Sequence, residues 1–442
     1  MQNTQTSNKV IIIGAGLGGL TLAQGLKKAG IPFHVYERDP TSDFRAQGYR
    51  IRLNHNGGEA LKNNLPPELF NLFERTCGGI FAGFARINAL DGKPLVEENP
   101  FNGQKGPGGP GGFGGPKGPN GSGGPGGPGG PGPWGVTGKD GKSLGPYTVD
   151  RTTFRALLLL GLEENVTFGK EFERYEESEK GVTVHFKDGS SVEGGLLIGA
   201  DGVRSRVRKQ YLPESVVVDT DGRIIYGKTT LTEELKEKIP KQNMKGINIV
   251  VDKRYETPLN LFYEPIYFEK DVGVESNGRL PSMKDYIYWV LFSRKATMGI
   301  EDDRLWKMTT EEVVKYSLKL SEDWDPNFRS ILELQDVNQT SVLRISSALP
   351  DIPFWTPSAR VTLLGDAIHV MPPTGGIGAN TALTDALTLC QALVEGGITA
   401  ESVGKYEEKM RKYAKEAIEF SEMGGKKLYN QPPFEECKRL EL

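Results

Sequence analysis

The clearest pattern near the start of the chain is a run of four β-branched residues, Val10 to Ile13, interrupted by glycines at position 14 and beyond. A continuous apolar run is typical of a strand that is covered on both faces. Leu20, Leu22, Ala23 and Leu26 then recur at helical spacing, and this helix is expected to end near residue 30. A second strand is predicted over 33–37. The three elements together form a βαβ unit.

Later segments repeat these two patterns. A strand is predicted over 50–53, and the segment 86–95 is predicted to be a strand that turns at Asp91-Gly92. A hairpin is predicted to turn at Asp188-Gly189 before an apolar strand that ends at Gly199. Another buried strand is expected over 360–365. Short runs rich in Tyr, Phe, Ile and Val between 223 and 296 predict an antiparallel sheet. Helices are predicted to begin near 57 and to span 151–162, 311–320, 381–395 and 405–423.

A low-complexity tract interrupts the globular pattern. The 33 positions from Gly103 to Gly135 hold 18 glycines and 8 prolines. Between 106 and 132 glycine falls at every third position, which leaves a collagen-like interaction segment as an alternative. Glycine also fills other positions of the triplets, so a disordered insertion is the favoured interpretation. Deletion of residues 106–132 is expected to leave cofactor binding intact.

Charge and cysteine content exclude several classes of protein. The chain of 442 residues carries 54 Lys and Arg against 57 Asp and Glu, a net charge of −3, so a nucleic-acid-binding surface is not expected. Three widely separated cysteines do not form a disulfide framework and fit a reducing compartment. No signal-peptide or membrane-spanning pattern is found, and the four histidines lack metal-site spacing. We therefore expect a cytoplasmic protein with no metal site and leave its oligomeric state open.

The glycine turn after the first strand carries the first chemical signal. Gly14, Gly16 and Gly19 form a GxGxxG motif between a strand and a helix. The first glycine permits the tight turn, the second lets a pyrophosphate approach the backbone, and the third lets helix and strand pack closely. Glu37, at the end of the second strand, stands where an acid would hold ribose hydroxyls. Dinucleotide binding is indicated, and the motif alone leaves FAD and NAD as alternatives.

A second glycine-rich turn follows the strand that ends at Gly365. Asp366, at the end of that strand, is placed to accept hydrogen bonds from the hydroxyls of a sugar chain. The turn that follows, from Thr374 to Asn380, offers successive backbone amides at the start of a helix. Such a helix start stabilises negative charge by ~0.3–1 kcal/mol. Because a reduced flavin is negatively charged on its pyrimidine edge, this turn favours FAD.

Three motifs together resemble those of single-component FAD-dependent aromatic monooxygenases, the p-hydroxybenzoate hydroxylase-like family. They are GAGLGGL with Glu37, GADGVRSRVR at 199–208 and GDAIHVMPPTGGIGAN at 365–380. The tracts at 47–54, 149–155 and 286–292 look most similar to fungal members that act in secondary metabolism. The resemblance implies an α/β fold: a Rossmann-like FAD-binding domain with an inserted mixed β-sheet substrate domain. Expected parts are FAD-binding segments at 1–78, 145–215 and 351–395, a substrate-side strand at 79–102, the insertion at 103–135, a substrate sheet at 216–350 and a helical region at 396–442.

The resemblance also implies roles for individual residues. Glu37 and Arg38 would hold the adenosine ribose, Arg151 and Arg155 would contact the flavin, and Asp366 would bind the ribityl chain. Asp201 would serve both FAD and a passing NADPH or NADH, with positive charge from Arg204 and Arg208. The full set of expected cofactor-binding residues is Gly14, Gly16, Gly19, Glu37, Arg38, Arg151, Arg155, Asp201, Gly202, Gly365, Asp366, Pro373, Gly376, Gly378 and Asn380.

The reaction that the resemblance implies is oxygen transfer from dioxygen, through a C4a-hydroperoxide of the flavin, to an electron-rich aromatic, polyketide-type or alkaloid-type molecule. Hydroxylation and epoxidation both remain open. The cofactor would carry this chemistry, and the protein would exclude water and orient the substrate. No catalytic side chain is identified, and the weak candidates are His55, Arg52 and Tyr226. An apolar wall is expected from Tyr226, Phe262, Tyr286, Tyr288 and Trp289, although core packing is an alternative role for each. A non-oxygenating FAD oxidoreductase on the same fold is a further alternative.

Overall fold

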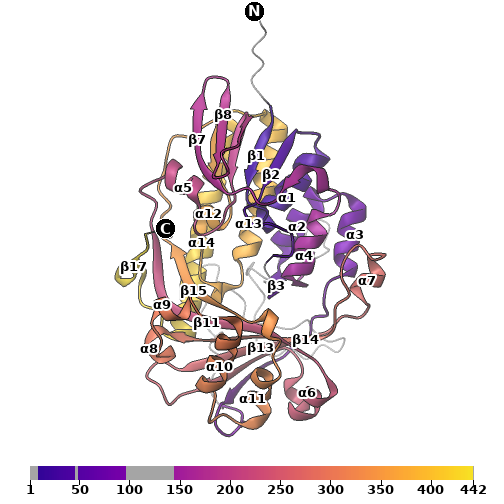
Figure 1. Cartoon of the computed structure of the whole chain (residues 1–442), viewed down its shortest axis with the longest axis vertical. Coiled ribbons are helices and arrows are strands. Elements are labelled where there is room, and N and C mark those ends of the chain that lie inside the picture. Colours follow the sequence, from indigo (N-terminus) through magenta and orange to yellow (C-terminus); the bar gives the residue numbers. More distant parts are fainter. Residues whose placement is uncertain (1–7, 45–47, 96–143, 442) are drawn as a thin grey trace, which may run out of the picture.

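Two sheets organise the chain, and the computed structural model describes residues 8–44, 48–95 and 144–441 (Figure 1). The Gly/Pro-rich tract at 103–135 lies outside the described residues. The first sheet is parallel, with the order β16-β10-β1-β2-β6. Its strands are β1 (Val10–Ile13), β2 (Phe33–Tyr36), β6 (Val166–Thr167), β10 (Leu196–Gly199) and β16 (Val361–Leu363). Because β1, β10 and β16 are buried throughout, they read in the sequence as continuous apolar runs.

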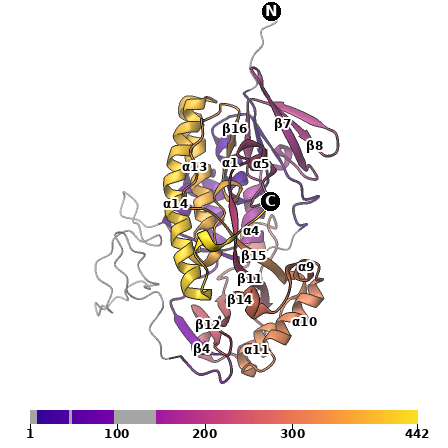
Figure 2. The ribbon, with the colours of Figure 1, turned by 90° about the vertical axis from the view of Figure 1, so that its left-hand side faces the viewer.

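Helices and a small sheet cover the two faces of this parallel sheet (Figure 2). On one side α1 (Leu17–Lys28) packs against α13 (Gly378–Gly396), and α13 packs against the 30-residue helix α14 (Ala400–Tyr429). On the other side lies an antiparallel sheet of β7 (Phe172–Ser178), β8 (Gly181–Phe186) and β9 (Ser191–Gly194), with β8 in contact with β10. The layers are those of a Rossmann-like domain.

The second large sheet is mixed. Strands β11 (Val217–Thr230), β12 (Ile247–Asp252), β13 (Leu259–Ile266), β14 (Tyr286–Arg294) and β15 (Ser341–Ala348) pair antiparallel, and β4 (Phe84–Asn88) joins β12 in parallel. The short β17 (Lys438–Arg439) pairs with β11. One face of the sheet packs with α10 (Thr310–Leu320) and α11 (Pro326–Glu333) into a separate apolar core. The other face is turned toward the parallel sheet (Figure 1).

Shorter elements connect the two sheets. The two-stranded sheet of β3 (Arg50–Leu53) and β5 (Tyr147–Asp150) precedes α4 (Arg151–Leu159). The other helices are α2 (His55–Asn64), α3 (Pro67–Arg75), α5 (Arg206–Tyr211), α6 (Glu233–Lys238), α7 (Val272–Glu275), α8 (Lys295–Met298), α9 (Asp302–Leu305) and α12 (Asp366–His369). Within the described ranges, none of the helices is long and apolar enough to cross a membrane.

Most predicted elements are confirmed, and the differences lie at their ends. The predicted helix over 151–162 ends at Leu159, two residues before Gly161, which has a φ of 78°. The turn predicted at Asp91-Gly92 is confirmed: β4 ends at Asn88, Gly92 has a φ of 66°, and the chain folds back so that the amide of Leu95 donates to the carbonyl of Arg86. In both segments a left-handed glycine ends the regular element.

Candidate active site

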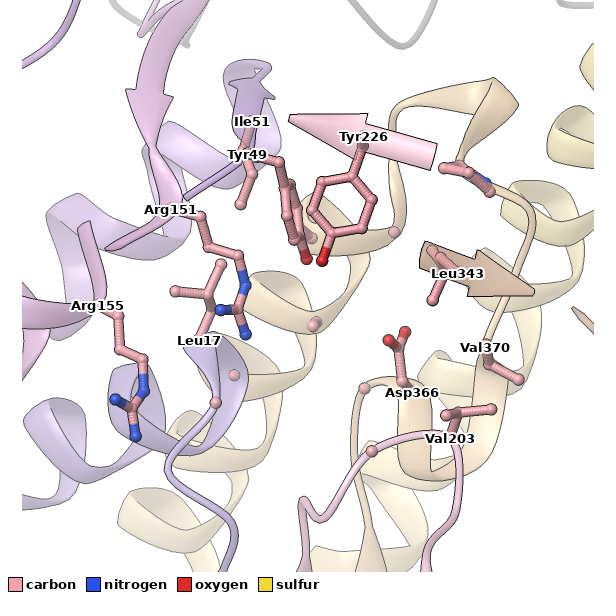
Figure 3. Close-up of a pocket in the computed structure, with 18 of the residues that line it drawn as sticks. Leu17, Tyr49, Ile51, Arg151, Arg155, Val203, Tyr226, Leu343, Asp366 and Val370 are labelled. Carbon is pink, nitrogen blue, oxygen red and sulfur yellow. The ribbon is translucent and has the colours of Figure 1, made fainter. Parts of the chain in front are cut away.

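A cavity of about 1710 Å³ lies between the parallel sheet and the mixed sheet. In the orientation of Figure 3, its lower wall is formed by the loops that follow β1, β10 and β16, and its upper wall by β11, β13, β14 and β15. Figure 3 shows the Asp366 carboxylate and the hydroxyl groups of Tyr49 and Tyr226 pointing into the same space. The volume exceeds the ~300–1,000 Å³ of an ordinary single-ligand pocket, so the cavity offers room for more than one molecule.

The loops after the three parallel strands are fastened to one another by backbone hydrogen bonds. The Gly14 amide donates to the Tyr36 carbonyl at 2.8 Å, and the Ala200 amide donates to the Ile13 carbonyl at 2.8 Å. Gly14 has a φ of 110°, and a Cβ atom there would lie 2.3 Å from the Ala200 carbonyl oxygen. Strands β2 and β10 flank β1 on opposite sides, so these loops open at the point where the strand order reverses. In open α/β sheets ligands bind at this point.

Glu37 fixes the first of these loops. Its side chain is buried, with one carboxylate oxygen accepting from the Ala15 amide at 2.7 Å and the other from the Asp39 amide at 3.0 Å. Glu37 and the neighbouring Arg38 both line the cavity. The carboxylate therefore holds the glycine turn in place and still has lone pairs for a ligand hydroxyl group.

Asp366 reaches into the cavity from the loop after β16. Its side chain is open to the cavity but is surrounded by protein, and this burial raises the pKa of its carboxyl group, against the attraction of His369 and Arg151. Behind it, the buried Asp385 accepts from the Gly365 amide at 2.7 Å and lies 2.6 Å from His369 Nε2. Burial alone would lower the pKa of His369, but Asp385 outweighs it and raises that pKa. His369 and Asp385 thus brace the loop that presents Asp366.

Asp201 and Arg208 are occupied within the loop that follows β10. Asp201 accepts from Ser205 Oγ at 2.5 Å and from the Arg206 amide at 2.9 Å, and burial raises the pKa of its carboxyl group. Arg208 is buried and donates to the carbonyls of Ala367 and Val203, both at 2.8 Å. Arg208 therefore ties two cavity loops together, whereas Arg204 is exposed and lines the cavity.

Two arginines of α4 approach the cavity from the side. Arg151 lies with its guanidinium carbon 5.3 Å from the centre of the Tyr49 ring, and its side chain extends into the cavity (Figure 3). Arg155 donates through Nε to the Ala15 carbonyl at 2.8 Å and also contacts the Ser42 carbonyl. The two residues, four positions apart on one helical face, thus have different roles: Arg155 holds the glycine turn, and Arg151 faces the cavity.

The turn after Pro373 delivers the start of α13 to the cavity. Gly376 has a φ of 64°, and no side chain caps the first turn of α13, so its backbone amides at Gly378 and Ala379 face the cavity. Asn380 differs from its neighbours, because its side chain accepts from the Asn54 amide at 2.9 Å and donates to the Arg52 carbonyl at 3.0 Å. Its side chain therefore joins α13 to β3 and is not part of the cavity lining.

The upper wall follows the alternation of a β-strand. Tyr288, Val290 and Phe292 of β14 line the cavity at every second position, and Phe262 of β13 lies beside them. Trp289 points to the other face, where it is fully buried and donates to Thr229 Oγ1 at 3.1 Å. The expectation that Trp289 and Tyr286 line the cavity was therefore wrong: Tyr286 also lies outside the lining and donates to Asp150 at 3.2 Å.

Comparison with known proteins identifies the family. A family model described as an FAD binding domain matches residues 161–421, more than half of the chain. The chain belongs to this FAD-binding family. A second model, for an NAD(P)-binding Rossmann-like domain, matches residues 12–76. The resemblance to FAD-dependent monooxygenases is thereby confirmed, as is the fold class expected from it.

Relatives of this FAD-binding chain include fungal monooxygenases. The dual O-methyltransferase/FAD-dependent monooxygenase CTB3 of Cercospora beticola is 37% identical over 98% of this chain, which spans 48% of that relative. The FAD-dependent monooxygenase thnD of Trichoderma harzianum is 28% identical, with 87% of this chain and 82% of the relative covered. A crystal structure from Photorhabdus luminescens, assigned as an FAD-containing monooxygenase, shares 28% identity at a TM-score of 0.70 and covers 95% of this chain and 98% of its own. The chain thus spans about half the length of the dual-function relative.

The cavity of the FAD-binding chain fits an extended dinucleotide. An added Cβ atom at Gly16 or Gly202 would meet no atom within 4 Å, so the backbone at both positions is open to a ligand. The start of α1, like that of α13, has no side-chain cap. Both helix starts therefore offer unpaired amides, and positive helix ends, to an anionic group. Diphosphate at α1, ribityl hydroxyls at Asp366 and a pyrimidine edge at α13 match this set of donors and acceptors.

The structure brings most of the residues predicted from the sequence to the same cavity. The members of the predicted set that line it are Gly14, Gly16, Gly19, Glu37, Arg38, Arg151, Arg155, Asp201, Gly202, Gly365, Asp366, Pro373, Gly376 and Gly378, together with Arg52 and Tyr226. Asn380 and His55 lie outside the lining, and His55 Nδ1 is 3.4 Å from the Leu144 amide. No group of three metal-ligating side chains occurs among the described residues.

Sequence reasoning missed several residues of the cavity. Arg50 and Tyr49 line it, and Glu264 lies directly behind the lining, in contact with Arg50 and Arg52. The alternation Arg50-Ile51-Arg52 in a predicted strand places both arginines on one face and was the available signal. Glu264 had none, because it stands more than 200 residues away in a strand that is mostly apolar.

Proposed function

We propose that this chain is an FAD-dependent monooxygenase that consumes NADPH or NADH and dioxygen and hydroxylates or epoxidises an electron-rich aromatic molecule of secondary metabolism. The observation that supports it best is the continuity of the cavity. The same space that begins at the glycine turn and Glu37 passes Asp366 and ends against Phe262 and Tyr288. Cofactor loops and an aromatic wall therefore face each other with no intervening barrier.

In this proposal, different residues of the chain bind different parts of the cofactor. FAD, when bound, supplies the chemistry: it accepts a hydride and activates dioxygen at C4a for transfer to the substrate. Glu37 and Arg38 hold the adenosine end, Arg151 faces the flavin, and Asp366 binds the ribityl hydroxyls. The amides at Gly378 and Ala379 stabilise negative charge on the pyrimidine edge. Arg204, exposed at the loop after β10, attracts the dinucleotide reductant.

The upper wall excludes water and orients the substrate. Apolar side chains from β11, β12 and β14 face the cavity: Ile224, Ile249, Val290 and Phe292. Removal of water protects a reactive oxygen species from unproductive decay. A planar ring held against Phe262 and Tyr288 would present one edge toward the cofactor loops, which shortens the path for oxygen transfer.

The names of the fungal relatives support a phenolic substrate or product. Several are named FAD-dependent monooxygenases of fungi, and the first joins this activity to an O-methyltransferase in one polypeptide. Hydroxylation of an aromatic ring creates a phenolic hydroxyl group, and a phenolic hydroxyl group is what an O-methyltransferase modifies. We therefore propose that the substrate or product of this chain is a phenol that a methyltransferase also modifies.

The test is incorporation of labelled oxygen. Purified protein reconstituted with FAD is incubated with NADPH or NADH, ¹⁸O₂ and a panel of naphthols, hydroxyanthracenes and other polyketide-type phenols. The proposal predicts substrate-dependent oxidation of the reductant and a product that carries one labelled oxygen atom. A different result would favour the non-oxygenating oxidoreductase. In that case the reductant is oxidised, an organic acceptor is reduced, and no product carries labelled oxygen. The same assay with Asp366→Asn, which is expected to bind FAD more weakly, is the control for cofactor dependence.

A further inference from the structure

Two arginines and one glutamate form a buried cluster where β3 meets β13. Arg50 and Arg52 alternate on one face of β3, and each donates through Nη2 to a different oxygen of Glu264. The side chains of Arg50 and Arg52 are 12% and 15% exposed, and that of Glu264 is 3% exposed. Both arginines line the cavity beside the aromatic wall. The cluster therefore joins the cofactor-binding part of the chain to the substrate side.

The charges of this cluster do not balance. Two cations share one carboxylate, so one positive charge is left over. Within the described ranges, the other N–H groups of the two guanidinium groups have no acceptor, and Nε of Arg50 is buried without one. Asp150, which lies opposite Arg50 in the pairing of β3 with β5, is already bound by Lys228 and Tyr286. Burying unpaired charge is costly, and a bound anion would offset that cost.

The surroundings define the shape of that anion. The guanidinium carbon of Arg50 lies 5.5 Å from the centre of the Phe262 ring and 5.8 Å from that of Tyr288. Tyr49 and Tyr226 stand edge to face with ring centres 5.7 Å apart on the neighbouring wall. Burial raises the pKa of Tyr288, so its hydroxyl group stays protonated and able to donate. These flat side chains suit a planar ring whose oxygen reaches the arginines.

We propose that Arg50 and Arg52, held together by Glu264, bind the ionised ring oxygen of a planar aromatic substrate, a phenolate or an enolate. The inference rests on the proposed function, since it places the substrate in this part of the cavity. Binding removes the hydroxyl proton to water and leaves the negative charge on the ring oxygen beside the surplus positive charge. The ionisable and charged groups that face this position are Arg50, Arg52, Glu264, Tyr49, Tyr226 and Tyr288. The anionic ring is richer in electrons and so a better acceptor of an electrophilic oxygen.

The experiment measures the pKa of a bound phenol and needs no turnover. FAD-loaded protein is titrated with 1-naphthol, and naphtholate absorbance is followed as the pH is raised. An opposite charge within ~4–6 Å lowers a pKa by roughly 1 to 3 pH units, so bound naphthol should ionise that far below free naphthol. The methyl ether 1-methoxynaphthalene, of nearly the same shape, should bind at least about tenfold more weakly at alkaline pH.

The variants predict shifts of opposite sign. Arg52→Gln removes the surplus charge and should return the pKa of bound naphthol toward its value in water, whereas Arg52→Lys should keep most of the shift. Glu264→Gln adds to the surplus and should lower that pKa further. Arg344→Gln, a cavity-lining arginine on β15, is the matched control and should change nothing. If the cluster only held β3 against β13, Arg52→Gln and Glu264→Gln would change the pKa of bound naphthol in the same direction.

Several results would overturn the inference: no binding of naphthol to FAD-loaded protein, ionisation as in water, equal affinity for the ether, or shifts of one sign in both variants. Failure of the proposed function is recognised separately, because it appears as missing ¹⁸O incorporation in protein whose flavin absorbance is intact. If the protein lowers the pKa of bound naphthol but transfers no oxygen, the proposed anion site stands and the proposed monooxygenase function fails.

Discussion

Asp366 presents its carboxylate to the cavity from a loop that is fixed to the buried framework behind it. Its carboxylate faces the cavity, while Asp385 and His369 fix the adjacent Gly365 amide. A hydrogen bond to a charged group contributes ~1.5–3 kcal/mol, so Asp366→Asn should weaken FAD binding by about 10- to 100-fold. Quenching of flavin fluorescence on titration measures this. Asp303→Asn, an exposed aspartate outside the cavity, should bind FAD as the parent does. Equal affinity of the two variants would contradict the role given to Asp366.

Residue-level prediction succeeded where a local motif places the residue and failed where a distant partner does. Asp366 follows a buried strand directly, so its place at the sheet edge follows from the sequence. Asn380 belongs to the same motif, yet its side chain bonds to the backbone of Arg52 and Asn54. Asp385, which completes the support of the loop, lies in the middle of an ordinary amphipathic helix and carries no pattern of its own.

At the scale of an element, the turn from β1 to α1 depends on contact between two loops. Gly14→Ala would place a Cβ atom 2.3 Å from the Ala200 carbonyl oxygen at a φ of 110°. Because the backbone of one of these two loops must then move, we expect Gly14→Ala to lose FAD binding as well as stability. Gly30→Ala is the matched control, since φ is 70° there and no atom lies within 4 Å. It should cost only ~1–2 kcal/mol of left-handed strain and leave FAD binding unchanged. Urea unfolding and retained flavin distinguish the two, and similar flavin loss in both would contradict the contact.

Substitutions in β14 test whether alternate side chains of this strand face the core and the cavity. Trp289 lies in the core on the helical side, so Trp289→Ala should lower the free energy of unfolding by ~3–5 kcal/mol. Tyr288 faces the cavity, so Tyr288→Phe should change ligand affinity with little effect on stability. Denaturant unfolding and naphthol titration on both variants provide the measurement. Sequence periodicity predicted this strand but not which of its faces is the cavity wall, because both faces are apolar and only the packing of α10 and α11 decides between them.

For the molecule as a whole, stability should depend on pH through a buried acid far from the cavity. Glu407 of α14 is fully buried and accepts one hydrogen bond, from Thr362 Oγ1 of β16 at 2.8 Å. Burial raises the pKa of Glu407 from 4.5 to about 7. The folded chain therefore binds this proton more tightly than the unfolded chain. This contribution to stability is present at acidic pH and is lost as the pH rises from 4.5 to about 7.

Glu407→Gln keeps the oxygen that accepts from Thr362 and removes the charge. It should raise the free energy of unfolding above neutral pH by up to about 3 kcal/mol, since each pKa unit corresponds to ~1.4 kcal/mol, and should change little at pH values below 4.5. Glu408→Gln, whose exposed side chain pairs with Lys412, is the control and should be nearly neutral at every pH. Urea unfolding of the three proteins across this pH range measures the difference. If Glu407→Gln followed the pH profile of the parent, ionisation of Glu407 would not limit the stability of the layer between α14 and β16.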